Sequence, residues 1–177
     1  GAIHFDFKRY PFESWHSIWH RWDTRHFERL AQYSYSPLGL SQLDHEFLSH
    51  VPPGFPTLIW MLTKVGIPLY FAGFLIPILS FVIASLILYE LALHEYKDRK
   101  VALRAVTYLA IFPTSYFSQM PYSEATFLMW SVLCFYFLRV KENLFLACLF
   151  AFLATTTRWI GVTLFPVLAL QGLIWLR

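Results

Sequence analysis

The sequence predicts an all-α, polytopic membrane protein with about five hydrophobic spans behind an N-terminal extracytoplasmic segment of interfacial helices. Hydrophobic residues make up 57% of the 177 residues and charged residues only 14%, whereas soluble domains have about 45–50% and about 25%. The charges are unevenly spread, because residues 1–52 hold five basic and six acidic residues and six of the seven histidines. The remainder consists of long apolar stretches with charges clustered between them, as spans joined by loops would be.

Residues 1–65 form the predicted extracytoplasmic and juxtamembrane region. Trp15, Trp19 and Trp22 follow helical spacing, so they would form one stripe of a helix over about residues 13–32. Because tryptophan is enriched at membrane–water boundaries, this helix is predicted to lie along the headgroups. The alternative is an amphipathic helix that packs its tryptophan stripe on the protein itself.

A proline-rich stretch follows at residues 51–56, with the sequence VPPGFP. Three prolines and a glycine within six residues predict a helix break there. The next apolar stretch, residues 57–65, is shorter than the roughly 20 residues that a span needs. We therefore expect a short juxtamembrane helix over residues 57–65.

Residues 66–177 form the predicted transmembrane region. The five expected spans are residues 67–93, 101–118, 123–138, 144–157 and 160–176. Merging the sequence around Arg158 into one long helix would leave four spans, but the polar Thr155-Thr156-Thr157-Arg158 run and Gly161 favour a hairpin. Because the sequence has no initiating Met and stops directly after an apolar run, we interpret it as a piece of a longer protein.

Loop charges predict the orientation. Residues 94–104 carry Lys97, Arg99, Lys100 and Arg104, and the next such loop follows Arg139; the positive-inside rule places both loops in the cytoplasm. Residues 1–52 and the turns 119–124 and 157–161 are then extracytoplasmic and meet at one face. The expected location is the plasma membrane of a prokaryote or the endoplasmic reticulum membrane of a eukaryote.

Three ionisable residues near this face are candidates for chemistry, namely Asp23, Glu124 and Arg158. Charges near a membrane are costly, so each is expected to face a partner or a wet cavity. A purely structural role is the alternative for each: Asp23 in a surface ion pair, Glu124 as an acid at a helix N-terminus, and Arg158 reaching lipid phosphates.

Several classes of site are not expected. His16 and His20 have a spacing that can chelate, but there is no H-E-x-x-H motif and no cysteine set, so no metal is predicted. Cys134 and Cys148 lie in apolar spans and are interpreted as packing residues. No basic run suggests a nucleic-acid partner, and no glycine-rich phosphate loop suggests a nucleotide cofactor.

Four motifs resemble, in order, those of the GPI mannosyltransferase 2 (PIG-V) family and its prokaryotic relatives. They are R-W-D-x-x-H-F at residues 21–27, H-E-F followed by P-G-F-P at residues 45–56, Y-S-E-A-x-F at residues 122–127, and F-A-F-x-A-T-x-x-R-x-x-G at residues 150–161. The sequence departs from the family pattern at Pro52-Pro53, Pro121 and Trp159-Ile160. These positions bear on the acceptor and the sugar.

The resemblance implies a fold of the GT-C type and a membrane glycosyltransferase without a cofactor. It implies that Asp23 is the catalytic base and that mannose passes from a polyprenyl-phosphate-linked donor to a hydroxyl of a lipid or glycolipid acceptor, with inversion. The substrate-binding residues that we expect beside Asp23 are Arg21, Trp22, Arg25, His26, Tyr122, Glu124 and Arg158. The expected partners are membrane lipids and these two lipid substrates.

Two other functions remain open from the residues themselves. A transporter or flippase would also place charges in a membrane cavity, although it more often shows internal repeats, and we find no such repeat in this sequence. A non-catalytic membrane subunit would keep the spans but tolerate Asp23→Asn.

Overall fold

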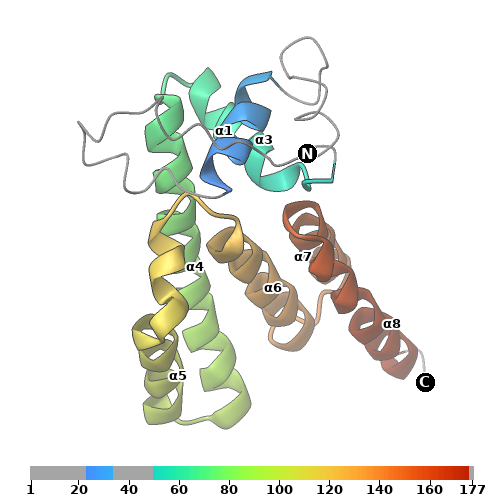
Figure 1. The fold of residues 1–177 in the computed structure, drawn as a ribbon. Helices are drawn as coiled ribbons and strands as arrows, with labels where there is room; N and C mark the ends of the chain where they lie inside the picture. The colour runs from blue at the N-terminus through green and yellow to red at the C-terminus, as the bar shows by residue number, and fades with distance from the viewer. Residues whose placement is uncertain (1–22, 34–49, 176–177) are drawn as a thin grey trace, which may run out of the picture.

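The computed structural model describes residues 23–33 and 50–175, and within them every regular element is helical. Figure 1 shows the long helix α4 (Leu69–Tyr96) beside α5 (Arg99–Ile111), with α6 (Glu124–Arg139), α7 (Leu144–Thr157) and α8 (Leu164–Trp175) following across the molecule. Helices α1 (Thr24–Tyr33) and α3 (Gly54–Lys64) lie across one end of this bundle. The predicted all-α class is therefore confirmed for the described residues.

Helix α1 confirms only the last part of the helix predicted over residues 13–32. Its inward face carries Phe27, Leu30 and Ala31, all buried, and the Phe27 ring meets the edge of Phe55 from α3 with centroids 5.0 Å apart. This face packs on the protein. Trp15, Trp19 and Trp22, on which the prediction of an interfacial helix rests, lie outside the described residues.

The proline-rich stretch begins a helix instead of only breaking one. Helix α3 starts at Gly54, with Pro53 as its N-cap residue, and includes Pro56 in its first turn. The first N–H groups of a helix need no partner within it, so proline is tolerated there. The expected helix over residues 57–65 therefore starts three residues early.

Helix α4 combines the length and composition of a membrane span. It has 28 residues with a hydropathy of 2.5 in its most apolar window, and its length is about 42 Å at 1.5 Å per residue. Among the described helices it is the one that meets both conditions, while residues Leu144–Thr157 and Trp159–Trp175 form shorter apolar helices. The structure thus supports one span by length and composition, fewer than the five predicted.

The span predicted over residues 101–118 is not one continuous α-helix. Helix α5 ends at Ile111, Phe112 is extended, and a 3₁₀ helix, η3, runs over Pro113–Gln119. Proline disfavours the helical conformation of the residue before it and has no N–H to donate. The hydroxyl of Ser115 donates to the carbonyl of Leu109, which the break leaves without its helical donor.

The hairpin at Arg158 is confirmed over the alternative of one long helix. Arg158 has an extended backbone (φ −148°, ψ 133°) between α7 and a 3₁₀ helix, η4 (Trp159–Thr163). Helix α8 then runs back along α7, because Gly161 lies against Ala154 and Thr155 whereas Gly172 lies against Leu144. Gly161 allows this return, since a Cβ there would sit 2.5 Å from the backbone nitrogen of Thr155.

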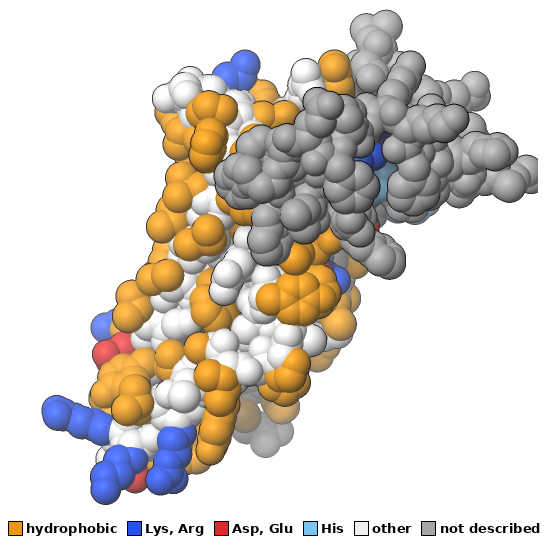
Figure 2. Space-filling model, turned by 60° about the vertical axis from the view of Figure 1, so that its left-hand side comes forward, with side chains coloured by type: hydrophobic (Ala, Val, Ile, Leu, Met, Phe, Trp, Pro, Cys, Tyr) orange, Lys and Arg blue, Asp and Glu red, His pale blue; other side chains and the backbone are white. Residues whose placement is uncertain are grey.

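Basic residues gather at the end of the bundle opposite α1 and α3. The α4–α5 turn carries Lys97, Arg99 and Lys100, and Arg139 at the end of α6 pairs with Glu95 at 2.9 Å. Figure 2 shows Lys and Arg side chains gathered at the lower end, below a flank of hydrophobic side chains. The two loops predicted to be cytoplasmic therefore lie at the same end of the bundle.

Candidate functional site

Tyr122 lies at the end of the bundle where α1, α3 and α4 meet. Its ring is buried in a cluster with Phe27, Phe55 and Ile76, and it contacts Phe117 with ring centroids 5.7 Å apart. This packing fixes the phenol at the base of the turn that leads into α6.

The electrostatics of Tyr122 show which charges surround it. Burial raises the pKa of the phenol, the negative charges of Asp23 and Glu124 and the nearby Tyr116 raise it further, and a hydrogen bond with Thr24 acts in the opposite direction. The phenol is therefore neutral at physiological pH. Glu124 follows Tyr122 by two residues, and Asp23 directly precedes Thr24, which hydrogen-bonds the phenol.

Glu124 and Arg158 form an ion pair across two predicted extracytoplasmic turns. Nη1 of Arg158 lies 2.5 Å from Oε1 of Glu124, and the two side chains keep 40% and 45% of their surface exposed. The same Nη1 lies 3.4 Å from Oγ of Ser123. An arginine held in this way stays available at the surface for a phosphate or another anion.

Each partner of this pair is placed by the end of a helix. Glu124 is the first residue of α6, where the helix dipole favours an anion. Ser123, the N-cap residue of α6, makes no side-chain cap bond, and its hydroxyl contacts Arg158 instead. Arg158 follows the last residue of α7, and its backbone N–H still donates to the carbonyl of Ala154.

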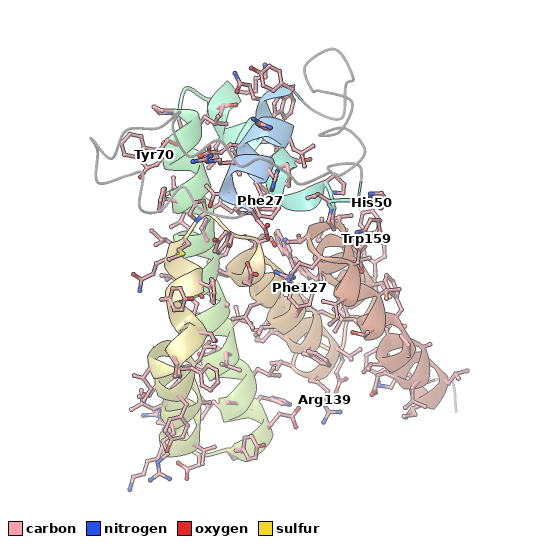
Figure 3. The ribbon with its side chains drawn as sticks, in the orientation of Figure 1. Phe27, His50, Tyr70, Phe127, Arg139 and Trp159 are labelled. Atoms are coloured by element: carbon pink, nitrogen blue, oxygen red, sulfur yellow. The ribbon has the colours of Figure 1, made fainter. Side chains whose placement is uncertain are left out.

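Two further contacts hold the Arg158 turn against the rest of the site. The indole N–H of Trp159 donates to the carbonyl of His50 at 2.8 Å, and Figure 3 shows these two side by side at the same end as Phe27 and opposite Arg139. Gly54 lies so close to α7 that a Cβ would sit 2.7 Å from the carbonyl oxygen of Thr156. The start of α3 therefore braces the end of α7.

Helix α1 contributes the remaining described candidates. Asp23 precedes its first turn, where its carbonyl accepts the backbone N–H groups of His26 (3.0 Å) and Phe27 (3.1 Å), and its side chain is exposed. Arg25 is exposed on the same helix, and His26 is half-buried.

The structure brings Asp23, Tyr122, Glu124 and Arg158 to one end of the bundle. Arg21 and Trp22 lie outside the described residues. Sequence reasoning missed Thr24, a fully buried threonine that hydrogen-bonds Tyr122, and nothing in the local sequence distinguishes it from a surface threonine. It likewise missed Ser123 as a second partner of Arg158, because the two are 35 residues apart.

Within residues 23–33 and 50–175, no group of three or more His, Cys, Asp or Glu side chains is placed to hold a metal ion. The site contains two exposed carboxylates (Asp23 and Glu124), the neutral phenol of Tyr122 and the ion-paired Arg158. Such a set can accept a proton, hydrogen-bond hydroxyls and bind an anion. Comparisons with protein-family models, with curated proteins and with solved structures find no match to this chain.

Proposed function

We propose that this protein is a membrane-embedded glycosyltransferase that moves mannose from a polyprenyl-phosphate donor to a hydroxyl of a lipid or glycolipid acceptor, with inversion at the anomeric carbon. The observation that carries the proposal is the meeting of Asp23, Tyr122, Glu124 and Arg158 at one end of an apolar helical bundle. The order of the four sequence motifs that resemble the PIG-V family supports the choice of chemistry.

The proposal includes a polytopic arrangement in which α4, α5 with η3, α6, α7, and η4 with α8 cross the membrane. Large apolar side chains are exposed along these helices, for example Leu86 at 63% and Leu170 at 61%, and water-facing surfaces rarely carry so many. Helix α6 has 16 residues, or about 24 Å, against a hydrocarbon core of about 30 Å. A locally thinned bilayer accommodates that difference.

In the proposed reaction Asp23 accepts the proton of the acceptor hydroxyl while the oxygen of that hydroxyl attacks the anomeric carbon. The bond between that carbon and the donor phosphate breaks, and the polyprenyl phosphate leaves as an anion that needs no proton. Arg158 stabilises this anion by charge-assisted hydrogen bonds, with Arg25 as a second cation on α1. Tyr122 and Glu124 hydrogen-bond sugar hydroxyls, and His26 orients Asp23 or the sugar.

The test compares the wild-type protein with Asp23→Asn, both in membranes at matched expression, with radiolabelled polyprenyl-phosphate-mannose and a lipid extract of the host. General-base catalysis contributes roughly 10²–10⁴-fold, so the variant should lose at least about a hundredfold of the transfer rate. Asp98→Asn is the matched control, because Asp98 caps α5 at the opposite end by accepting the N–H of Lys100 at 2.7 Å and asparagine caps equally well. Unchanged transfer by Asp23→Asn would remove Asp23 from the mechanism.

A transporter or a non-catalytic membrane subunit is the competing proposal. Either one predicts no mannosyl transfer by the wild-type protein under the same conditions.

A further inference from the structure

A cleft of about 600 Å³ opens between α4, α5, η3 and α6. Four aromatic residues line it, namely Phe81 on α4, Tyr108 on α5, Phe112 directly after α5, and Phe117 on η3. Its volume lies in the range of about 300–1,000 Å³ that small-molecule sites have, and such sites are mostly apolar with a few polar groups. On a flank of otherwise hydrophobic helices, this lining suits a hydrocarbon chain.

The polar groups of the cleft favour a hydroxyl over an anion. Among the described residues that line it there is one charged group, the carboxylate of Glu124, together with hydroxyl groups such as those of Thr114 and Ser118, and no Lys or Arg. A carboxylate only accepts hydrogen bonds, so it favours a hydroxyl donor, and Arg158, the ion-pair partner of Glu124, is not among the residues that line the cleft. The cleft therefore selects a neutral headgroup.

The cleft and the candidate site share Glu124. Glu124 is one of the lining residues, and its carboxylate pairs with Arg158. Phe117, another lining residue, contacts the ring of Tyr122, whose pKa responds to the charge of Asp23. A headgroup bound at the Glu124 end of the cleft would thus lie next to the site, whereas an anion would find its cation at Arg158.

We infer that this cleft holds the hydrocarbon chain of a neutral, hydroxyl-bearing lipid acceptor, with one headgroup hydroxyl donating to Glu124. The inference rests on the proposed function and names the class of its acceptor. It separates the two lipid substrates, because the anionic phosphate of the donor is directed to Arg158 and the neutral acceptor to the cleft.

The test uses two photoactivatable probes that share one diazirine-bearing alkyl chain and differ in their headgroup. One is a monoglucoside and the other a phosphate monoester. The full-chain protein in phosphatidylcholine nanodiscs is irradiated with each probe, and the labelled peptides are mapped. The glucoside should label residues 112–128 at least about ten times as strongly as the phosphate, and excess unlabelled alkyl glucoside should remove that label.

Leu128 lines the cleft, so Leu128→Trp should fill it and reduce the label at least about fivefold. Leu170→Trp is the matched control, because Leu170 is exposed on α8 and does not line the cleft. Glu124→Gln should lower the ratio of labelling by the glucoside probe to labelling by the phosphate probe. Equal labelling by the two probes, or full labelling of a folded Leu128→Trp protein, would overturn the inference.

Mannosyl transfer is measured separately on the same preparations. Transfer without preferential labelling of the cleft would refute the assignment of the cleft and leave the proposed function in place. Preferential labelling without transfer to any acceptor would refute the proposed function and leave the cleft as a binding site for neutral lipids.

Discussion

Tyr122 is the residue whose titration reports most directly on the geometry of the site. Its raised pKa has burial as the main cause and the charges of Asp23 and Glu124 as the next. Because the folded state holds the phenolic proton more tightly than the unfolded state, this group stabilises the fold fully below its ordinary pKa of 10.0. That stabilisation is lost as the pH rises through the folded-state pKa.

We therefore expect the tyrosinate absorbance that wild type has and Tyr122→Phe lacks to rise with a midpoint above the ordinary tyrosine pKa. Asp23→Asn should shift that midpoint to lower pH, because it removes a negative charge that raises the pKa. Tyr108→Phe, which removes an exposed phenol, is the control and should leave the late component in place. A Tyr122 transition at or below the ordinary value would mean that the ring is not enclosed by α1 and the two carboxylates.

Substitution of Arg158 is expected to affect mannosyl transfer much more than stability. Its ion pair with Glu124 is about half exposed, and pairs of this kind contribute roughly 0.2–1 kcal/mol. Arg158→Gln should therefore change the free energy of unfolding by less than about 1 kcal/mol but lower transfer by roughly 10²–10³-fold, as loss of a group that stabilises the transition state does.

Arg139→Gln is the matched control for this experiment, because it breaks the equivalent ion pair with Glu95 at the other end of the bundle. Thermal unfolding in detergent and initial transfer rates should show similar small losses of stability for both variants, and lost transfer for Arg158→Gln alone. Comparable activity of the two variants would make the Arg158 pair structural.

At the scale of elements, the site depends on the close packing of α3 and η4 against the end of α7. Gly54 and Gly161 permit it, since a Cβ at either position would sit within 3.0 Å of backbone atoms of α7. Backbone atoms cannot change rotamer as a side chain can, so α3 or η4 would have to move away from α7. Thr24 and Arg158 would then be displaced relative to Tyr122.

Gly54→Ala and Gly161→Ala should each lower the free energy of unfolding by about 1–3 kcal/mol, as overpacking does. Gly172→Ala is the matched control, because its new Cβ would meet only the side-chain end of Leu144 at 3.3 Å. Chemical unfolding in mixed micelles measures the free energy of unfolding of all three variants under the same conditions. Equal stability of Gly54→Ala and Gly172→Ala would contradict the bracing of α7 by α3.

At the scale of the whole molecule, the two loops predicted to be cytoplasmic lie at one end of the bundle and the candidate site at the other (Figure 3). If the polytopic proposal is correct, the two ends lie on opposite sides of the membrane with the basic end in the cytoplasm.

Single cysteines at the two ends test this arrangement in a background where Cys134 and Cys148 are replaced by alanine. In sealed vesicles with the extracytoplasmic side outward, Lys64→Cys at the end of α3 should react with a membrane-impermeant maleimide, and Lys141→Cys only after permeabilisation. Both positions are exposed in the protein. Reaction of both without permeabilisation would place the two ends on the same side.

The residue types and their order were enough to predict the helical class, the apolar character of the segments and the residues at which most of them turn. Helix α7 matches its predicted range of 144–157, because Asn143 caps it and a polar run ends it. Composition did not predict where each helix ends. Helix α5 stops at Ile111, before Pro113, although the apolar stretch continues to residue 118. Composition also could not show that α3 begins within the proline-rich stretch.

Which side chains meet depends on how the helices pack, and the sequence did not predict it. Arg158 reaches Glu124 across 34 positions of sequence, and Thr24 reaches Tyr122 from a helix almost 100 positions away. Local propensity and periodicity describe neighbours within a few residues along the chain. The site, in contrast, is formed where three helix ends are held together by the burial of Phe27, Phe55 and Tyr122.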